Sequence, residues 1–209
     1  DCEIQEGWLS KAAAFLRDHD DVAVVCGRRR ERFPTASRYN RMIDEEWDTP
    51  VGEARACGGD ALMRSEAFDA VGGFNPDLIA GEEPELCVRL RNAGWRVWRL
   101  DAEMTAHDAA LTRFGQWWTR ARRAGHAYAE GAALHGAPPE RHNVAETRRA
   151  VLWGLAIPVA ALLGASLTPW ALALLLAWPL QIARLSLRGQ NPESALFLTL
   201  GKLPEALGV

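Results

Sequence analysis

Two adjacent carboxylates, Glu82 and Glu83, stand at the start of a predicted helix, directly after a glycine-containing loop. The stretch 80–90 reads AGEEPELCVRL and lies between a VGGF turn at 71–74 and an NAGW turn at 92–95. A carboxylate in such a place can act as a general base on a bound hydroxyl. A structural role is the alternative, because acidic residues in a first helical turn stabilise the positive end of the helix dipole, and Pro84 suits that turn.

The elements that must position these carboxylates alternate along the first part of the chain. Apolar residues at helical spacing predict helices over 6–19, 37–47, 65–71, 83–92 and 112–134, while strands are predicted over 22–25, 54–63 and 95–100. This alternation indicates an α/β fold. Ser65 is a candidate N-cap for its helix, and Gly72 and Gly73 can supply the positive φ that ends it.

Charge and cysteine content exclude several classes of partner. The formal net charge is -3 with a pI near 6.0, so no basic field is present to attract nucleic acid, and none is expected as a partner. A short basic run at 28–32 is expected to be a solvated turn, with an anion contact as the alternative. The four cysteines form no CxxC pair, which indicates reduced thiols in a cytosolic domain rather than a zinc site or a disulfide framework.

The chain changes character at residue 150, since 150–183 contains no charged residue. This run is too long for one crossing of about 30 Å of hydrocarbon, and residues 164–169 divide it, which predicts a two-helix membrane hairpin. Arginines precede the run at 148 and 149 and follow it at 184 and 188, so both ends are expected on the cytoplasmic side. A buried helical pair in a soluble core is the alternative. The apolar tail is expected to be an interfacial helix or the beginning of another span.

As an ordered set, these motifs resemble the C-terminal half of a glycosyltransferase family 2 enzyme. The resemblance adds the opening DCEI at 1–4 and MTAHD at 104–108, and it covers residues 1–135. It implies a partial GT-A fold over 1–135, followed by a linker at 136–149, the hairpin at 150–188 and the tail at 189–209. A nucleotide-diphospho-sugar donor, a glycan or lipid-linked acceptor and Mg²⁺ or Mn²⁺ are implied as well.

The resemblance also assigns roles to individual residues. Asp1 matches the last aspartate of the family's metal-binding Asp-x-Asp motif, and His107 matches a position that in some GT-A enzymes gives an imidazole to the metal. Glu83 fills the second position of the family's Glu-Asp pair and is the expected base, with Glu82 as the alternative. The turn formed by Gly58, Gly59 and Asp60 resembles the acceptor-facing turn, although a structural β-bulge is equally compatible.

Aromatic and basic residues share the predicted helix over 112–134. Arg120 and Arg123 could contact diphosphate, and Trp118 could stack on a sugar or rest in the membrane interface. The alternative is an amphipathic helix that packs its tryptophan face on the catalytic domain.

The expected function is that of a membrane-anchored, inverting glycosyltransferase of the inner or plasma membrane, with a cytoplasmic catalytic domain and a cell envelope glycan as its product. The nucleotide-binding half of such a fold normally precedes the Asp-x-Asp strand, so we expect the isolated chain to bind nucleotide weakly and to be inactive. A non-catalytic membrane scaffold is one alternative. A processive polysaccharide synthase is another, which the sequence WWTRARR at 117–123 disfavours because it lacks the QxxRW pattern.

Overall fold

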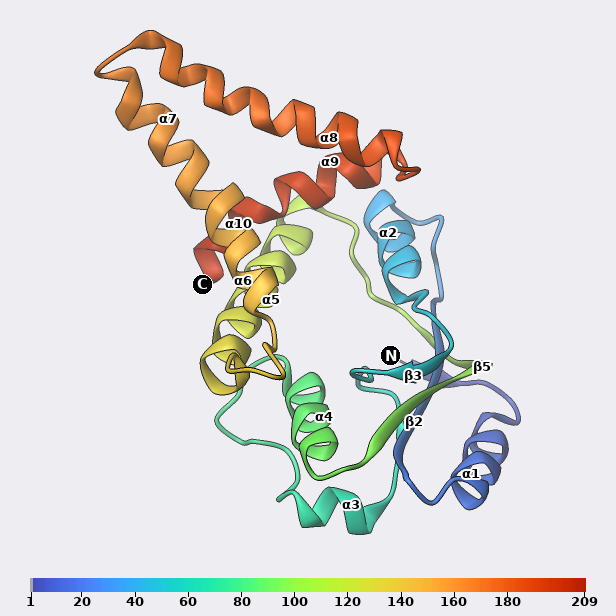
Figure 1. Cartoon of the computed structure of the whole chain (residues 1–209). Helices are drawn as coiled ribbons and strands as arrows, with labels where there is room; N and C mark the ends of the chain where they lie inside the picture. The colour runs from blue at the N-terminus through green and yellow to red at the C-terminus, as the bar shows by residue number, and fades with distance from the viewer. Residues whose placement is uncertain (1) are drawn as a thin grey trace. The chain divides into compact units, whose positions relative to one another are not determined.

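The computed structural model describes residues 2–209, which form two compact units (Figure 1). The chain passes from the first unit to the second between Arg113 and Phe114. The described part of the first unit is a mixed α/β structure, and that of the second is helical. This arrangement confirms the predicted fold class, an α/β domain followed by apolar helices that could form a membrane hairpin.

The sheet of the first unit is built on two long parallel strands, β2 (Val22–Glu31) and β5 (Arg96–His107). Three short strands pair antiparallel with them: β1 (Cys2–Ile4) and β3 (Gly52–Ala54) with β5, and β4 (Leu62–Met63) with β2. The strand order is therefore β1-β5-β2-β4, with β3 also on β5. Both long strands continue well beyond their apolar halves, further than the sequence pattern predicted.

Helices α1 (Trp8–Asp18) and α4 (Glu82–Asn92) cover opposite faces of this sheet (Figure 1). The two faces are visible at consecutive residues of β2, because neighbouring side chains of a strand point to opposite sides. Gly27 lies under α1, where an added Cβ would approach the Trp8 ring to 2.7 Å. Cys26 shares the buried core with Cys87 of α4. The sheet is thus the middle layer of an α/β/α arrangement.

Two further helices lie in the first unit, α2 (Arg38–Trp47) and α3 (Ser65–Ala70). Ser37 caps α2 by accepting the Asn40 N–H at 3.0 Å. The predicted Ser65 cap is wrong, because α3 begins with Ser65 itself and follows Arg64, whose guanidinium donates to the Val22 carbonyl at 2.8 Å. That bond fixes the entry to α3 from the sheet without a side-chain cap. At the other end, Gly72 and Gly73 have the expected positive φ angles of 82° and 68°.

The second unit begins with the long helix α5 (Phe114–His135). The remaining helical segments follow in order: α6 (Val144–Val151), the π-helical turn η1 (Leu152–Ala156), α7 (Ile157–Ala165), the 3-10 segment η2 (Pro169–Leu176), α8 (Ala177–Leu187), α9 (Pro192–Leu200) and α10 (Lys202–Gly208). The π-helical turn η1 lies just before Pro158, which has no backbone N–H and crowds the carbonyl one turn earlier.

Two continuous helical runs, Val144–Ala165 and Pro169–Leu187, are long and apolar enough to cross a membrane. They contain 22 and 19 residues, so each is longer than the half-run visible in the sequence. They form the hairpin drawn in orange in Figure 1. Many of their apolar side chains are exposed, including Leu162, Leu163 and Trp170.

Glycines allow the helices of the second unit to approach closely. Gly125 of α5 faces the backbone of Glu205 in α10, and Gly154 of η1 faces the backbone of Lys202 at the start of the same helix. In both places an added Cβ would overlap backbone atoms, which cannot rotate away as a side chain could. These contacts therefore require glycine.

We predict that Gly125→Ala destabilises the second unit, whereas Gly115→Ala in the same helix does not. Gly125 has the Glu205 backbone against it, while an added Cβ at Gly115 would meet nothing within 4 Å. Overpacking of this kind costs about 1–3 kcal/mol. Thermal unfolding of both variants in detergent checks the prediction. Equal melting temperatures for the two variants would contradict it.

Candidate active site

Asp60 follows the glycine pair in the loop that joins β3 to β4. Its carboxylate is held by hydrogen-bond donors from three strands. Its Oδ2 accepts from Thr105 Oγ1 at 2.6 Å, from Arg29 Nε at 2.9 Å and from Cys2 Sγ at 3.4 Å. Burial opposes its ionisation, but the Thr105 hydroxyl and the Arg29 guanidinium outweigh burial and hold the pKa of Asp60 below its ordinary value. Asp60 is therefore a fixed negative charge at neutral pH.

Glu83 lies in the first turn of α4, against the same glycine turn. An added Cβ at Gly59 would be 2.9 Å from Glu83 Oε1 and 3.8 Å from Arg29 Nη2. Gly59 thus leaves room for the glutamate carboxylate beside the backbone. Burial raises the pKa of Glu83, and the negative charges of Glu82 and Asp60 add to this rise. A carboxylate with a raised pKa is a better proton acceptor near neutral pH than an ordinary one.

His107 is the last residue of β5, and it pairs in register with Cys2 of β1. Its ring lies edge-on to Trp47, with ring centroids 5.4 Å apart. Its Nδ1 is buried and has no hydrogen-bond partner among residues 2–209. Burial lowers the pKa of His107, and Arg29 lowers it further, so the imidazole is neutral at physiological pH. A neutral imidazole nitrogen without a partner is chemically suited to bind a metal.

The other predicted metal ligand, Asp1, lies outside the described residues. Among those that the structure describes, no cluster of three His, Cys, Asp or Glu side chains could hold a metal ion. The described part of the site therefore offers one nitrogen ligand, His107 Nδ1, next to the strand that Asp1 precedes in the sequence.

The structure thus brings together the predicted residues Gly58, Gly59, Asp60 and Glu83, with the Arg29 guanidinium beside all four. Trp118, Arg120 and Arg123 belong instead to α5 of the second unit. In that unit the neighbouring Trp117 is buried against Phe197, at 5.0 Å between ring centroids.

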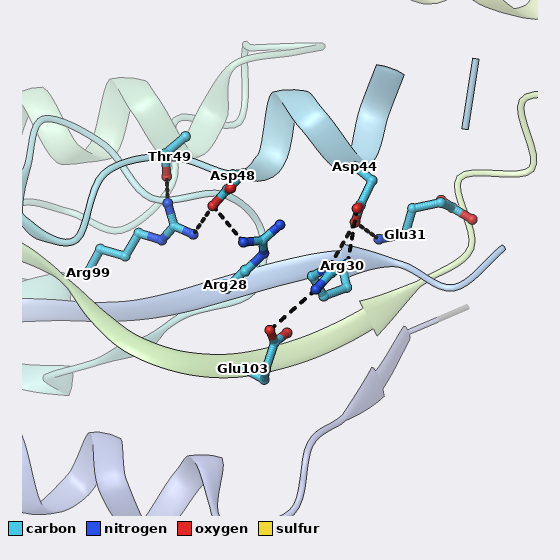
Figure 2. A network of polar contacts seen from close by, with 8 residues as sticks. All are labelled: Arg28, Arg30, Glu31, Asp44, Asp48, Thr49, Arg99 and Glu103. Carbon is cyan, nitrogen blue, oxygen red and sulfur yellow. Dashed lines mark hydrogen bonds and ion pairs between the residues drawn. The ribbon is translucent and has the colours of Figure 1, made fainter. Parts of the chain in front are cut away.

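Sequence reasoning missed three residues of the site: Arg29, Thr105 and Trp47. The expectation of a solvated turn at 28–32 is wrong, because residues 28–31 are the second half of β2. Arg28 pairs with Asp48 at 2.9 Å and Arg30 with Asp44 at 3.0 Å. Figure 2 shows that both contacts tie β2 to the α2 region. Arg29 instead contacts Asp60, at 2.9 Å. Neighbouring side chains of a strand point to opposite faces. This alternation was the one sequence signal that could have distinguished Arg29 from Arg28 and Arg30.

Comparison with known proteins supports the resemblance to glycosyltransferases that the sequence indicated. No family model matches the chain. A 51-residue segment is 47% identical to the succinoglycan biosynthesis protein ExoA of Rhizobium meliloti (strain 1021), over 24% of this chain and 16% of that protein. The fold is similar to that of the mannosyltransferase PcManGT from Pyrobaculum calidifontis, solved in complex with GDP-Man and Mn²⁺, with a TM-score of 0.57 and 18% identity.

The chain carries a glycosyltransferase family 2-like GT-A domain. The resemblance inferred from the sequence is thereby confirmed at the level of the domain and its fold. The structural match covers 97% of this chain but only 57% of the mannosyltransferase chain. The chain therefore spans just over half the length of this solved mannosyltransferase.

We predict that Asp60→Asn destabilises the GT-A-like domain at neutral pH and that the difference from wild type shrinks in acid. The folded-state pKa of Asp60 is lowered, so its contribution is present above the ordinary value of about 3.9 and is lost as the pH falls through the lowered pKa. Hydrogen bonds to a charged group contribute about 1.5–3 kcal/mol.

Thermal unfolding of wild type and Asp60→Asn between pH 7 and pH 3 measures this difference. Glu83, whose shift has the opposite sign, is present in both proteins, so its direct contribution largely cancels in the comparison. A difference that grows toward low pH would show that the contacts to Asp60 Oδ2 do not favour its charged form.

Proposed function

We propose that this chain is part of a membrane-anchored, inverting glycosyltransferase. It would move a sugar from a nucleotide-diphospho-sugar to a hydroxyl of a glycan or lipid-linked acceptor. The observation that carries the proposal is that the Glu83 carboxylate lies against the side-chain-free backbone of Gly59, the residue directly before Asp60. The partial match to ExoA, a protein of succinoglycan biosynthesis, and the GT-A-like fold support the same reaction class and suggest a cell envelope glycan.

The two carboxylates suit different tasks in this reaction. Glu83, with its raised pKa, removes the proton of the acceptor hydroxyl as the oxygen attacks the anomeric carbon. Asp60 stays ionised, and its Oδ1 accepts none of the three bonds that hold Oδ2, so it can accept a hydrogen bond from a sugar or acceptor hydroxyl. One group moves a proton and the other positions the substrate.

A divalent cation fits the remaining chemistry. Mg²⁺ or Mn²⁺ would neutralise the charge that develops on the departing diphosphate. His107 Nδ1, buried and unpartnered among the described residues, would hold it together with Asp1. The solved mannosyltransferase with the similar fold was obtained with Mn²⁺ and GDP-Man.

The apolar hairpin would anchor the enzyme. The runs Val144–Ala165 and Pro169–Leu187 have the length and composition of spans, and arginines flank both outer ends. We infer that the hairpin spans the inner or plasma membrane twice and that the catalytic domain is cytoplasmic. Trp118, Arg120 and Arg123 of α5 then remain candidate contacts for substrate or for the membrane interface.

We predict that Glu83→Gln in the natural full-length protein lowers kcat by about a hundredfold or more, the usual scale for a general base. Glu82→Gln serves as the matched control, because it removes the adjacent carboxylate of the same helical turn. The wild-type profile of kcat/KM against pH should show an acid limb above the ordinary glutamate range, since burial raises the pKa of Glu83.

Transfer of labelled sugar, measured with the donor that the wild type accepts, decides between the proposal and its rivals. A larger loss for Glu82→Gln would move the base to that residue. Full biological function in cells with Glu83→Gln would favour a membrane scaffold over an enzyme.

We also predict that the turn of the hairpin faces away from the cytoplasm. A single cysteine placed at the exposed Ser166, in a protein with Cys2→Ser, should react with a membrane-impermeant maleimide from outside the inner membrane. A cysteine placed at the exposed Gln190 should react only after lysis. Labelling of both positions from the same side would rule out two crossings.

A further inference from the structure

Arg29 stands at the centre of the site and contacts two parts of the first unit, the glycine turn with Asp60 and the ring of Trp47 at the end of α2. Its Nε donates to Asp60 Oδ2 at 2.9 Å. Its Nη2 lies under the glycine turn, 2.7 Å from where a Cβ of Gly58 would stand. Its guanidinium carbon is 5.1 Å from the centroid of the Trp47 ring, a cation-π arrangement. The planar head of Arg29 thus contacts both the glycine turn and the indole ring.

The position of Asp60 depends on this guanidinium. The Asp60 side chain lies in a loop, and Arg29 gives it a partly buried ion pair, with side-chain exposures of 19% and 23%. Arg29, Thr105 and Cys2 all donate hydrogen bonds to Asp60 Oδ2. These bonds restrict rotation of the carboxylate, so that Oδ1 can accept from another partner. An arginine with a planar fork can do this better than a lysine, whose charge is a single point.

The neighbouring arginines show that the contact is specific. Arg28 pairs with Asp48, which is half exposed, and Arg30 pairs with Asp44 and with the half-exposed Glu103. Those contacts join β2 to the α2 region and to β5 (Figure 2). Three consecutive arginines of one strand therefore differ in role, and Arg30 offers a matched control for Arg29.

We propose that Arg29 is a positioning residue that acts through Asp60, setting the orientation of the carboxylate that receives the acceptor or sugar hydroxyl. This inference rests on the proposed glycosyl transfer and deepens it. Arg29 does not contact the substrate in this role. It holds Asp60 Oδ2 and, with Trp47, keeps the glycine turn in the place where Glu83 Oε1 meets it.

The test is a double-mutant cycle in the natural full-length protein, with kcat and KM measured separately for donor and acceptor. Arg29→Met should lower kcat by about 10–100-fold, the range expected when a positioned group is misplaced. In an Asp60→Asn background the same change should cost less than about threefold, because the residue through which Arg29 acts is already altered. Arg29→Lys should recover only part of the loss, and Arg30→Met should leave kcat near wild type.

Three results would overturn the inference. Losses from Arg29→Met and Asp60→Asn that multiply in the double variant would show independent actions. A rise confined to the donor KM would make Arg29 a direct phosphate ligand instead. Equal losses for Arg29→Met and Arg30→Met, in step with their melting temperatures, would reduce Arg29 to a stability role. A wild-type protein without transfer to any acceptor would refute the proposed function itself, and this inference with it.

Discussion

The pairing of β2 with β5 is the constraint on which the first unit depends. The two parallel strands come from distant parts of the sequence, and their first halves bury an apolar core that includes Val22, Val24, Val25 and Val97. Burial of one such side chain contributes about 1.5–3 kcal/mol. The pairing continues into the polar halves after register shifts on both sides of Arg28, and there Arg29 and Thr105 are Cα partners. The hydrophobic stabilisation of one half therefore holds the charged groups of the other half in place.

The site depends, second, on side chains that pack closely against the backbone at two glycines. Glu83 can carry its carboxylate to the turn because Gly59 has no side chain, and α1 can lie on β2 because Gly27 has none. These two glycines have different tasks, since one makes room for a titratable group and the other for the Trp8 ring of the core. In both cases the missing Cβ lets another group pack directly against the backbone. A flexible side chain between them would not keep that distance constant.

Periodicity in the sequence was enough to predict most helices, the α/β class and the apolar hairpin, because burial of one face leaves a repeat of 3.6 or 2 residues. It could not predict the full length of β2, whose second half is polar and is stabilised by ion pairs with Asp44, Asp48 and Asp60, nor that of β5, whose Glu103 pairs with Arg30 of β2. Glu83, Asp60 and His107 were identifiable through a family resemblance. Arg29 was not, because the polar half of β2 was predicted as a turn, so the alternation of a strand was not used to separate Arg29 from Arg28 and Arg30.

The electrostatics of the site follow from where each carboxylate lies along these elements. Asp60 faces β2 and β5, whose Arg29 and Thr105 donors favour its charged form. Glu83 sits on α4 at the other side of the turn, where burial and nearby negative charge favour its neutral form. Two carboxyl groups that share one turn are thus driven to different pKa values by different neighbours, a division that in enzymes separates a charged binding group from a proton-transfer group. The roles that we propose for the two residues therefore rest on their surroundings, because the side chains carry the same functional group.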